Sequence, residues 1–281
     1  MVDTISSGTP VLDVSDVSVH FSGLAALSHV SFRVEPATVH AVIGPNGAGK
    51  SSCFNALTGV YRASTGTVTL GDHVLTGLRP HEITRFGVAR TFQNIALSRS
   101  QDVCENLMLA RHQLTKAGFL SNGLRLPRAV REERLHRRRV VEIAEFVGIA
   151  QYLNTECGAL PYGIQKKIEL ARALCLEPRV LLLDEPVAGL NSEETRDMAQ
   201  MILDVRDELG TSVLLVEHDM GMVMGIADRV TVLDFGKCIA DGTTEQIQND
   251  PAVVRAYLGT GKESSEASNP AEDPSSPEAQ P

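Results

Sequence analysis

Several features that define other classes of protein are missing from this sequence of 281 residues. Its five cysteines are odd in number and form no C-x-x-C pair, so the sequence predicts neither a disulfide framework nor a zinc site. No apolar run approaches the roughly 18 residues needed to cross a bilayer. The start, "MVDTISSGTPVLD", lacks the basic and apolar regions of a signal peptide. We therefore expect a cytoplasmic chain with reduced thiols, which reaches a membrane only through a partner.

The chain also lacks an excess of basic residues. Its formal net charge is −9, to which residues 260–281 contribute −4 through one Lys and five acidic residues. The acidic body argues against a nucleic-acid binder, which usually has a basic surface. Beyond Gly259 the composition is mainly Ser, Pro, Glu, Ala and Asn, so we expect 260–281 to be a disordered acidic tail.

Short apolar strands alternate with amphipathic helices over most of the chain, and internal repeats are absent. A long stretch from about Ile95 to Asn154 instead has a purely helical pattern. The alternation predicts an α/β fold with an open sheet flanked by helices. We expect one domain at 11–259, in which 11–94 and 165–259 form the core and 95–164 form an inserted helical subdomain.

A glycine-rich loop lies between a predicted buried strand at 38–44 and a predicted helix at 49–57. Its sequence fits G-x-x-x-x-G-K-[ST] at every position: Gly44, Pro45, Asn46, Gly47, Ala48, Gly49, Lys50 and Ser51. In such a loop the backbone N–H groups surround the α- and β-phosphates of a nucleotide, and Lys50 reaches the β- and γ-phosphates. The Ser51 hydroxyl is suited to Mg²⁺ and Ser52 to a phosphate. A glycine turn that binds nothing is disfavoured, because both flanks also match.

Polar side chains follow three other predicted strands. "VLLLDEP" places Asp184 and Glu185 at the carboxyl end of a buried strand, where ligands of open α/β sheets bind. Asp184 is suited to hold Mg²⁺ and Glu185 to polarise the attacking water. Gln93 follows "VARTF", and His218 follows "TSVLLVE". A lone histidine is more often a surface or core residue, but this position favours contact with the γ-phosphate.

The segment from Val11 to Gly259 resembles an ABC-transporter ATPase, because these motifs occur in the family's order. The resemblance implies a P-loop NTPase (RecA-like) core, an antiparallel β-subdomain and an inserted α-helical subdomain. It also implies that Phe21 stacks on adenine, although a core phenylalanine is the alternative. Gln93 matches a glutamine that responds to Mg²⁺ and to the membrane partner, and His218 matches the family's switch histidine.

The segment 160–164, Leu-Pro-Tyr-Gly-Ile, lies where the family has its Leu-Ser-Gly-Gly-Gln signature. In the family this helix N-terminus binds the γ-phosphate of ATP held by a second ATPase subunit, in a head-to-tail homo- or heterodimer. The resemblance thus assigns Tyr162 and Gly163 to the partner's ATP. We expect the helix dipole to add attraction for the phosphate, and the charges of Lys166 and Lys167 to strengthen it.

The signature and the D-loop depart from the family pattern in three places. Pro161 replaces Ser and offers neither a hydroxyl nor an N–H, while Ile164 replaces Gln. The D-loop at 188–191 ends in Asn191 instead of Asp. We therefore expect closure around the nucleotide to be weaker at this site, unless a companion subunit carries a stronger signature.

A narrower likeness rests on "LPYGIQKKIELARAL", "EPVAGLN", "VEHDMGMVMGIADRVTVLDFGK" and "DPAVVRAYLG". These segments look like the larger ATPase of branched-chain amino acid-type importers, a group in which the signature Ser is also often absent. The likeness implies ATP hydrolysis, separate integral-membrane permease subunits, a peripheral position at the inner face of the cell membrane and, indirectly, an external solute-binding protein. The sequence leaves the cargo open among leucine-like amino acids, urea, amides and aromatic or fatty acids.

Two other functions stay open from the sequence. One is a soluble ABC ATPase that acts on nucleic acid or ribosomes, although such proteins usually have two ATPase domains or a coiled-coil insertion. The other is a weakly hydrolysing regulatory subunit, which the signature departures permit. The segment from Arg125 to Arg139, with seven Arg and two Glu, is interpreted as a solvated helix face, or alternatively as a contact with anionic lipid headgroups.

Overall fold

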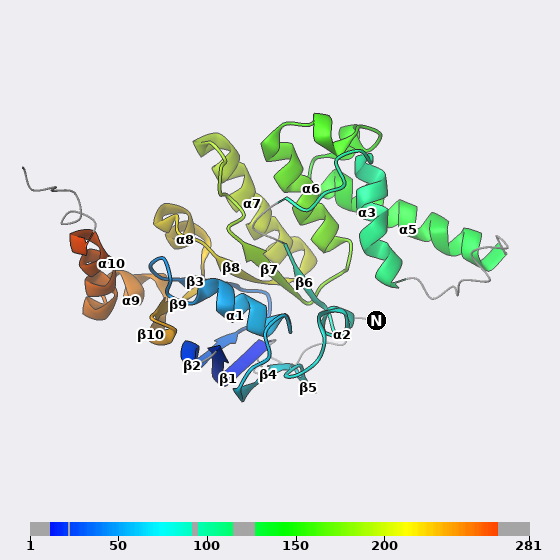
Figure 1. Cartoon of the computed structure of the whole chain (residues 1–281). Coiled ribbons are helices and arrows are strands. Elements are labelled where there is room, and N and C mark those ends of the chain that lie inside the picture. The colour runs from blue at the N-terminus through cyan, green and yellow to red at the C-terminus, as the bar shows by residue number, and fades with distance from the viewer. Residues whose placement is uncertain (1–11, 22, 92–94, 115–126, 264–281) are drawn as a thin grey trace, which may run out of the picture.

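The computed structural model describes residues 12–21, 23–91, 95–114 and 127–263 (Figure 1). A six-stranded sheet with the order β10-β9-β3-β8-β7-β6 forms the centre of the molecule. The strand β10 pairs antiparallel to β9, and the other neighbours pair parallel. Its strands are β3 (Val39–Ile43), β6 (Val88–Arg90), β7 (Val180–Asp184), β8 (Ser212–Val216), β9 (Arg229–Asp234) and β10 (Lys237–Gly242).

A second, antiparallel sheet with the order β2-β1-β4-β5 lies beside the first. It consists of β1 (Leu12–Phe21), β2 (Leu24–Val34), β4 (Thr65–Leu70) and β5 (His73–Val74). The helix α1 (Lys50–Leu57) buries Cys53, Phe54 and Leu57 in one apolar cluster with strands of both sheets. The fold is therefore the mixed α/β class that was predicted, with an antiparallel β part.

The remaining helices are distributed around the central sheet. In Figure 1, α3 and α5 extend from one end of the molecule, and α9 and α10 lie at the opposite end. They are α2 (Pro80–Arg85), α3 (Val103–Arg111), α5 (Pro127–Phe146), α6 (Tyr162–Leu174), α7 (Ser192–Leu209), α8 (Met220–Ile226), α9 (Thr244–Gln248) and α10 (Pro251–Glu263), with short 3₁₀ turns at His112–Leu114, Ala150–Tyr152 and Cys157–Ala159. Among the described residues between β6 and β7, only helices, turns and one isolated bridge occur.

The central strands are buried on both faces, which explains their nearly continuous apolar sequences. Side chains alternate across a strand, so Leu182 and Leu214 enter the cluster with α1 and the antiparallel sheet. Their neighbours Leu181 and Leu215 enter a second cluster with the helices on the other face. The two clusters fix the register of the strands, because a one-residue slip would exchange their contents.

Two boundaries predicted from the sequence differ from those in the structure. The disordered tail predicted from residue 260 begins too early, because α10 continues to Glu263. The predicted domain boundary at 164/165 falls inside the continuous helix α6. The helix α8 was not predicted, since "MGMVMGI" contains two glycines, which are poor helix formers. The N-cap of α7 is Asn191, whose side chain accepts the N–H groups of Glu193 and Glu194.

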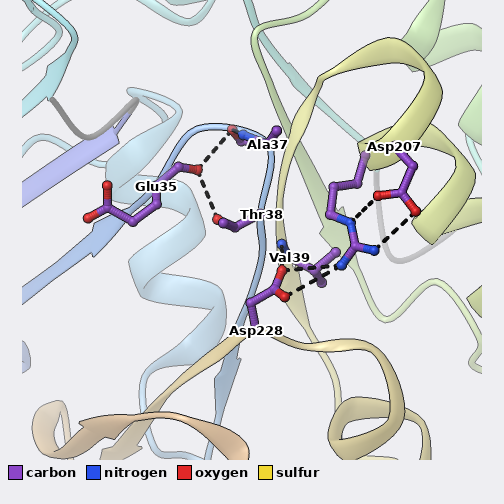
Figure 2. A network of polar contacts seen from close by, with 8 residues as sticks. Glu35, Ala37, Thr38, Val39, Asp207 and Asp228 are labelled. Atoms are coloured by element: carbon purple, nitrogen blue, oxygen red, sulfur yellow. Dashed lines mark hydrogen bonds and ion pairs between the residues drawn. The ribbon is translucent and has the colours of Figure 1, made fainter. Parts of the chain in front are cut away.

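A polar network ties the start of β3 to the segments before β8 and β9 (Figure 2). Asp228 accepts the N–H of Val39 at 2.8 Å and pairs with Arg206 at 3.4 Å. Arg206 also pairs with Asp207 on the surface of α7. Val39 is fully buried, so water cannot replace Asp228 as the acceptor of its N–H.

We expect Asp228→Ala to lower the free energy of unfolding by about 1–3 kcal/mol, because it leaves the buried Val39 N–H without its acceptor. The control is Asp207→Ala, which removes an exposed partner of the same arginine and should change stability by less than about 1 kcal/mol. Urea unfolding followed by circular dichroism measures both. Equal losses for the two variants would contradict the assignment to Val39.

Candidate functional site

The site lies where three parallel strands end at the same edge of the central sheet. Val216 at the end of β8 pairs with Val42 of β3 on one side and with Asp184 of β7 on the other. The chain leaves β3 into the loop that starts at Gly44, and it leaves β8 toward His218. The sheet register therefore places the glycine loop, the acidic strand end and the histidine segment next to one another.

Glycine is required at particular positions of the loop for steric reasons. A Cβ on Gly44 would lie 2.1 Å from the carbonyl oxygen of Leu233, and a Cβ on Gly49 would lie 2.9 Å from that of Ala26. The Ala48 carbonyl also accepts the Gly236 N–H at 2.9 Å. The loop backbone is therefore packed against β2 and the β9–β10 turn, and α1 starts directly after it with its positive dipole end at the loop.

Lys50, the first residue of α1, turns back onto the loop. Its ammonium donates to the carbonyl oxygens of Gly44 at 2.6 Å and Pro45 at 3.0 Å. Burial lowers the pKa of Lys50, and the charge of the Glu185 carboxylate opposes that shift. The cation is thus held at the loop and within the electrostatic influence of the acidic strand end. Ser51 is exposed and Ser52 half-buried in the first turn of α1.

Asp184 forms a buried ion pair with Arg90, the last residue of β6. One Arg90 nitrogen donates to Asp184 Oδ2 at 2.7 Å, while the other donates to Asn55 at 2.7 Å and to Thr58 at 3.2 Å. The side chains of Arg90 and Asp184 are only 12% and 6% exposed. A single guanidinium therefore connects β6, β7 and α1. Sequence reasoning missed Arg90, although an arginine at the end of a buried strand was a signal.

Glu185 adopts a left-handed backbone conformation with φ 50°. Such a conformation is costly for a residue other than glycine and occurs where the surroundings impose it. Its N–H donates to the Val216 carbonyl at 2.9 Å, and its own carbonyl accepts the Ala188 N–H at 3.2 Å and the Lys166 ammonium at 3.5 Å. These bonds turn the chain sharply at the end of β7.

The predicted signature segment begins α6 at Tyr162, with Pro161 as the N-cap residue. The half-exposed Tyr162 donates its hydroxyl to the Ala188 carbonyl at 3.3 Å. Lys166 is buried, lies 5.8 Å from the Tyr162 ring centroid and donates to the Glu185 carbonyl. Lys166 therefore faces the turn at Glu185 within its own chain. The expected effect of its charge on a bound phosphate stays a prediction.

Gly163 and Lys167 contact helix α7. A Cβ on Gly163 would lie 2.3 Å from Glu194 Oε1, so a larger residue at this position would require the Glu194 side chain to move. The Lys167 ammonium lies 3.7 Å from a carboxylate oxygen of Asp197, with which it forms an ion pair. Ile164 is partly buried and packs against the larger apolar cluster.

The other predicted site residues lie further out. The Phe21 side chain is 44% exposed, which excludes a core phenylalanine, and its ring meets Tyr61 edge to face at 4.8 Å. The His218 side chain is 64% exposed at the end of β8. Gln93 lies outside the described residues.

The arginine-rich segment is only partly described, because Arg125 and the side chains of 127–129 lie outside the described residues. On α5, Arg137 pairs with Glu133, and both Arg138 and Arg139 pair with Glu142 at helical spacing. This pairing is typical of an exposed charged helix face. Contact with lipid headgroups stays a prediction.

A glycine loop leads here from a buried strand into a helix whose first residue is a lysine, and a carboxylate lies at the end of a neighbouring strand. Together these features define a P-loop nucleoside triphosphatase. The oxygen donors of Ser51 and Asp184 suit Mg²⁺, which proteins usually bind through one or two carboxylates together with substrate phosphates. Among the described helices, none is both long and apolar enough to span a bilayer.

Comparison with known proteins identifies the family. The ABC transporter profile matches residues 27–188, and a profile described as branched-chain amino acid ATP-binding cassette transporter matches residues 237–263. The high-affinity branched-chain amino acid transport ATP-binding protein LivG of Escherichia coli (strain K12) is 43% identical, covering 89% of this chain and 98% of LivG. BraF of Pseudomonas aeruginosa is 42% identical over the same shares. The chain belongs to the ABC transporter family and is one of its ATPases.

Solved structures agree with this assignment. A crystal structure of the ADP conformation of an ATP-binding cassette from an ABC transporter has a TM-score of 0.78 and is 30% identical. The match covers 89% of this chain and 99% of that one.

We expect Arg90→Met to destabilise the protein by about 3–5 kcal/mol, because it leaves the Asp184 carboxylate buried without its cation. The double variant Arg90→Met/Asp184→Asn removes both charges and should regain a substantial part of this loss. Urea unfolding in the absence of nucleotide measures both. If the single variant were as stable as the parent, the ion pair would not hold these three elements together.

Proposed function

We propose that this chain is the ATP-hydrolysing subunit of an importer for branched-chain amino acids or a related small solute. The single observation that carries this proposal is the alignment of the glycine loop, Asp184, Glu185 and His218 along one edge of the sheet. The names of LivG and BraF support the class of cargo, because both are branched-chain amino acid transport proteins. The chain would drive separate permease subunits from the inner face of the membrane.

ATP binds in this proposal along the loop of Gly44, Pro45, Asn46, Gly47, Ala48 and Gly49, and along Lys50, Ser51 and Ser52 of α1. Steric packing at Gly44 and Gly49 supports this assignment, because the loop geometry depends on glycine there. The exposed ring of Phe21, already in edge contact with Tyr61, is available to stack on adenine. Lys50 exchanges its carbonyl contacts for phosphate oxygens when the nucleotide enters.

Hydrolysis is assigned to Glu185 and His218. The Glu185 carboxylate accepts a proton from the attacking water, and the exposed imidazole of His218 contacts the terminal phosphate. Ser51, Asp184 and Gln93 would hold Mg²⁺, which neutralises phosphate charge when bound. Arg90 fixes Asp184 Oδ2 and so limits the orientations of that carboxylate.

A second ATPase subunit completes the site in this proposal. Tyr162 and Gly163 at the N-terminus of α6 would approach the terminal phosphate of ATP held by that subunit, through backbone N–H groups and the helix dipole. The exposure of Tyr162 supports this role, since its ring is half open to solvent. The core and the helical part belong to one domain in this proposal, and α6 spans the predicted limit between them.

The replacement Glu185→Gln tests the assigned base. We expect ATP binding to be retained and steady-state hydrolysis to fall at least about a hundredfold, because general-base catalysis contributes about 10²–10⁴-fold. Binding is measured with a fluorescent ATP analogue, and hydrolysis by phosphate release. Glu193→Gln, an exposed glutamate on α7, is the control and should keep parental turnover. Parental turnover in Glu185→Gln would exclude Glu185 as the base.

The unmodified chain tests the alternative of a regulatory subunit. If it hydrolyses no ATP, either alone or with the permease, a regulatory subunit is favoured.

A further inference from the structure

Glu217 is a fully buried carboxylate that the proposed mechanism does not use. It is the first residue after β8, and its side chain is 0% exposed. A buried carboxylate is costly unless hydrogen-bond donors surround it. Here the donors come from two separate loops. The role of the buried carboxylate therefore depends on which residues those two loops contain.

Each oxygen of Glu217 accepts from a different loop. Oε1 accepts the N–H of Val187 at 3.1 Å, on the segment that follows β7. Oε2 accepts the N–H of His218 at 3.0 Å and that of Asp219 at 3.5 Å, on the segment that follows β8. The carboxylate therefore bridges the ends of two neighbouring strands beyond the last pair of the sheet ladder.

The two loops are those that carry the proposed base and the proposed switch histidine. Val187 lies two residues after Glu185, whose own N–H donates to the Val216 carbonyl at 2.9 Å. Oε2 of Glu217 also lies 3.8 Å from Nδ1 of His218, so the carboxylate is next to the imidazole as well as to the backbone of that residue.

We propose that Glu217 is a positioning residue that holds Glu185 and His218 in one fixed arrangement. The inference rests on the proposed function, because it gives meaning to the two residues that are positioned. A leucine of similar size would fill the same volume without bridging the loops, whereas the carboxylate offers an acceptor to each of them. Small displacements of reacting groups reduce catalysis strongly, so the distance between these loops matters for turnover.

Glutamine at this position separates the bridge from simple space filling. Glu217→Gln keeps the shape of the side chain but has one oxygen and one NH₂ group. Its oxygen can accept a hydrogen bond from only one loop, and its NH₂ group then faces the backbone N–H of the other loop, where no hydrogen bond can form. Glu217→Leu removes both acceptors. The matched control is Glu169→Gln on α6, where a buried glutamate accepts a single backbone N–H, that of Ala96, at 2.8 Å. Its replacement retains an oxygen acceptor for that donor.

The experiment measures ATP hydrolysis by the full chain with Mg²⁺, together with hydrogen exchange at the Val187 and His218 amides. We expect Glu217→Gln to lower kcat by about ten- to a hundredfold, with KM for ATP within about twofold, because nucleotide binding depends mainly on the Gly44–Ser52 loop. Exchange should accelerate at one or both amides. Glu169→Gln should keep kcat within about twofold. Glu217→Leu should lose at least as much kcat as Glu217→Gln.

Three results would overturn the proposal. One is unchanged kcat in a folded Glu217→Gln variant, and another is an equal loss in Glu169→Gln. The third is rapid exchange of both amides in the unmodified chain, a measurement that stays decisive if the variants fail to fold. If the unmodified chain shows protected amides but Glu185→Gln and His218→Ala retain full turnover, the proposed catalytic roles fail while the bridge itself stands.

Discussion

The site depends on the burial of both faces of three adjacent parallel strands, β3, β8 and β7. Alternate side chains such as Leu181 and Leu182 enter opposite apolar clusters, so a slip of one residue would move each side chain to the wrong face. This constraint fixes the strand ends relative to one another without any polar contact at the edge. Three loops that are distant in sequence therefore start at the same level, and the polar bonds described above only refine their positions.

Much of this arrangement could be predicted from the sequence, because its signals are local. The glycine loop is a contiguous pattern, and the acidic pair directly follows an apolar run. The alternation of strands and helices was sufficient to predict the α/β fold class. Predicted boundaries were less accurate where a helix has an unusual composition, as in α8, or continues into a polar segment, as at the end of α10.

The contacts that join the loops could not be predicted, because each connects residues far apart in the chain. Arg90 meets Asp184 across two strands, and Glu217 meets Val187 across two loops. Lys166 shows the limit most clearly: its place in the first turns of α6 predicted a charge near the helix end, but not its burial against the turn at Glu185. Helical periodicity gives the face on which a side chain lies, whereas the identity of the packed neighbour depends on the tertiary fold.

The start of α6 is linked within its own chain to the loop after β7. Tyr162 donates to the Ala188 carbonyl and Lys166 to that of Glu185, so both bonds end on the backbone of the turn formed by Glu185. Under the proposed function, a phosphate of the partner's ATP that pulls on Tyr162 and Gly163 would also strain this turn. Pro161 offers no N–H to such a phosphate. The attraction for the phosphate would therefore come from the residues after Pro161, among them Tyr162 and Lys166, which make the two bonds to the turn. Under the proposed function, the same helix end would thus face the partner's nucleotide and contact the backbone of the turn that carries the proposed base.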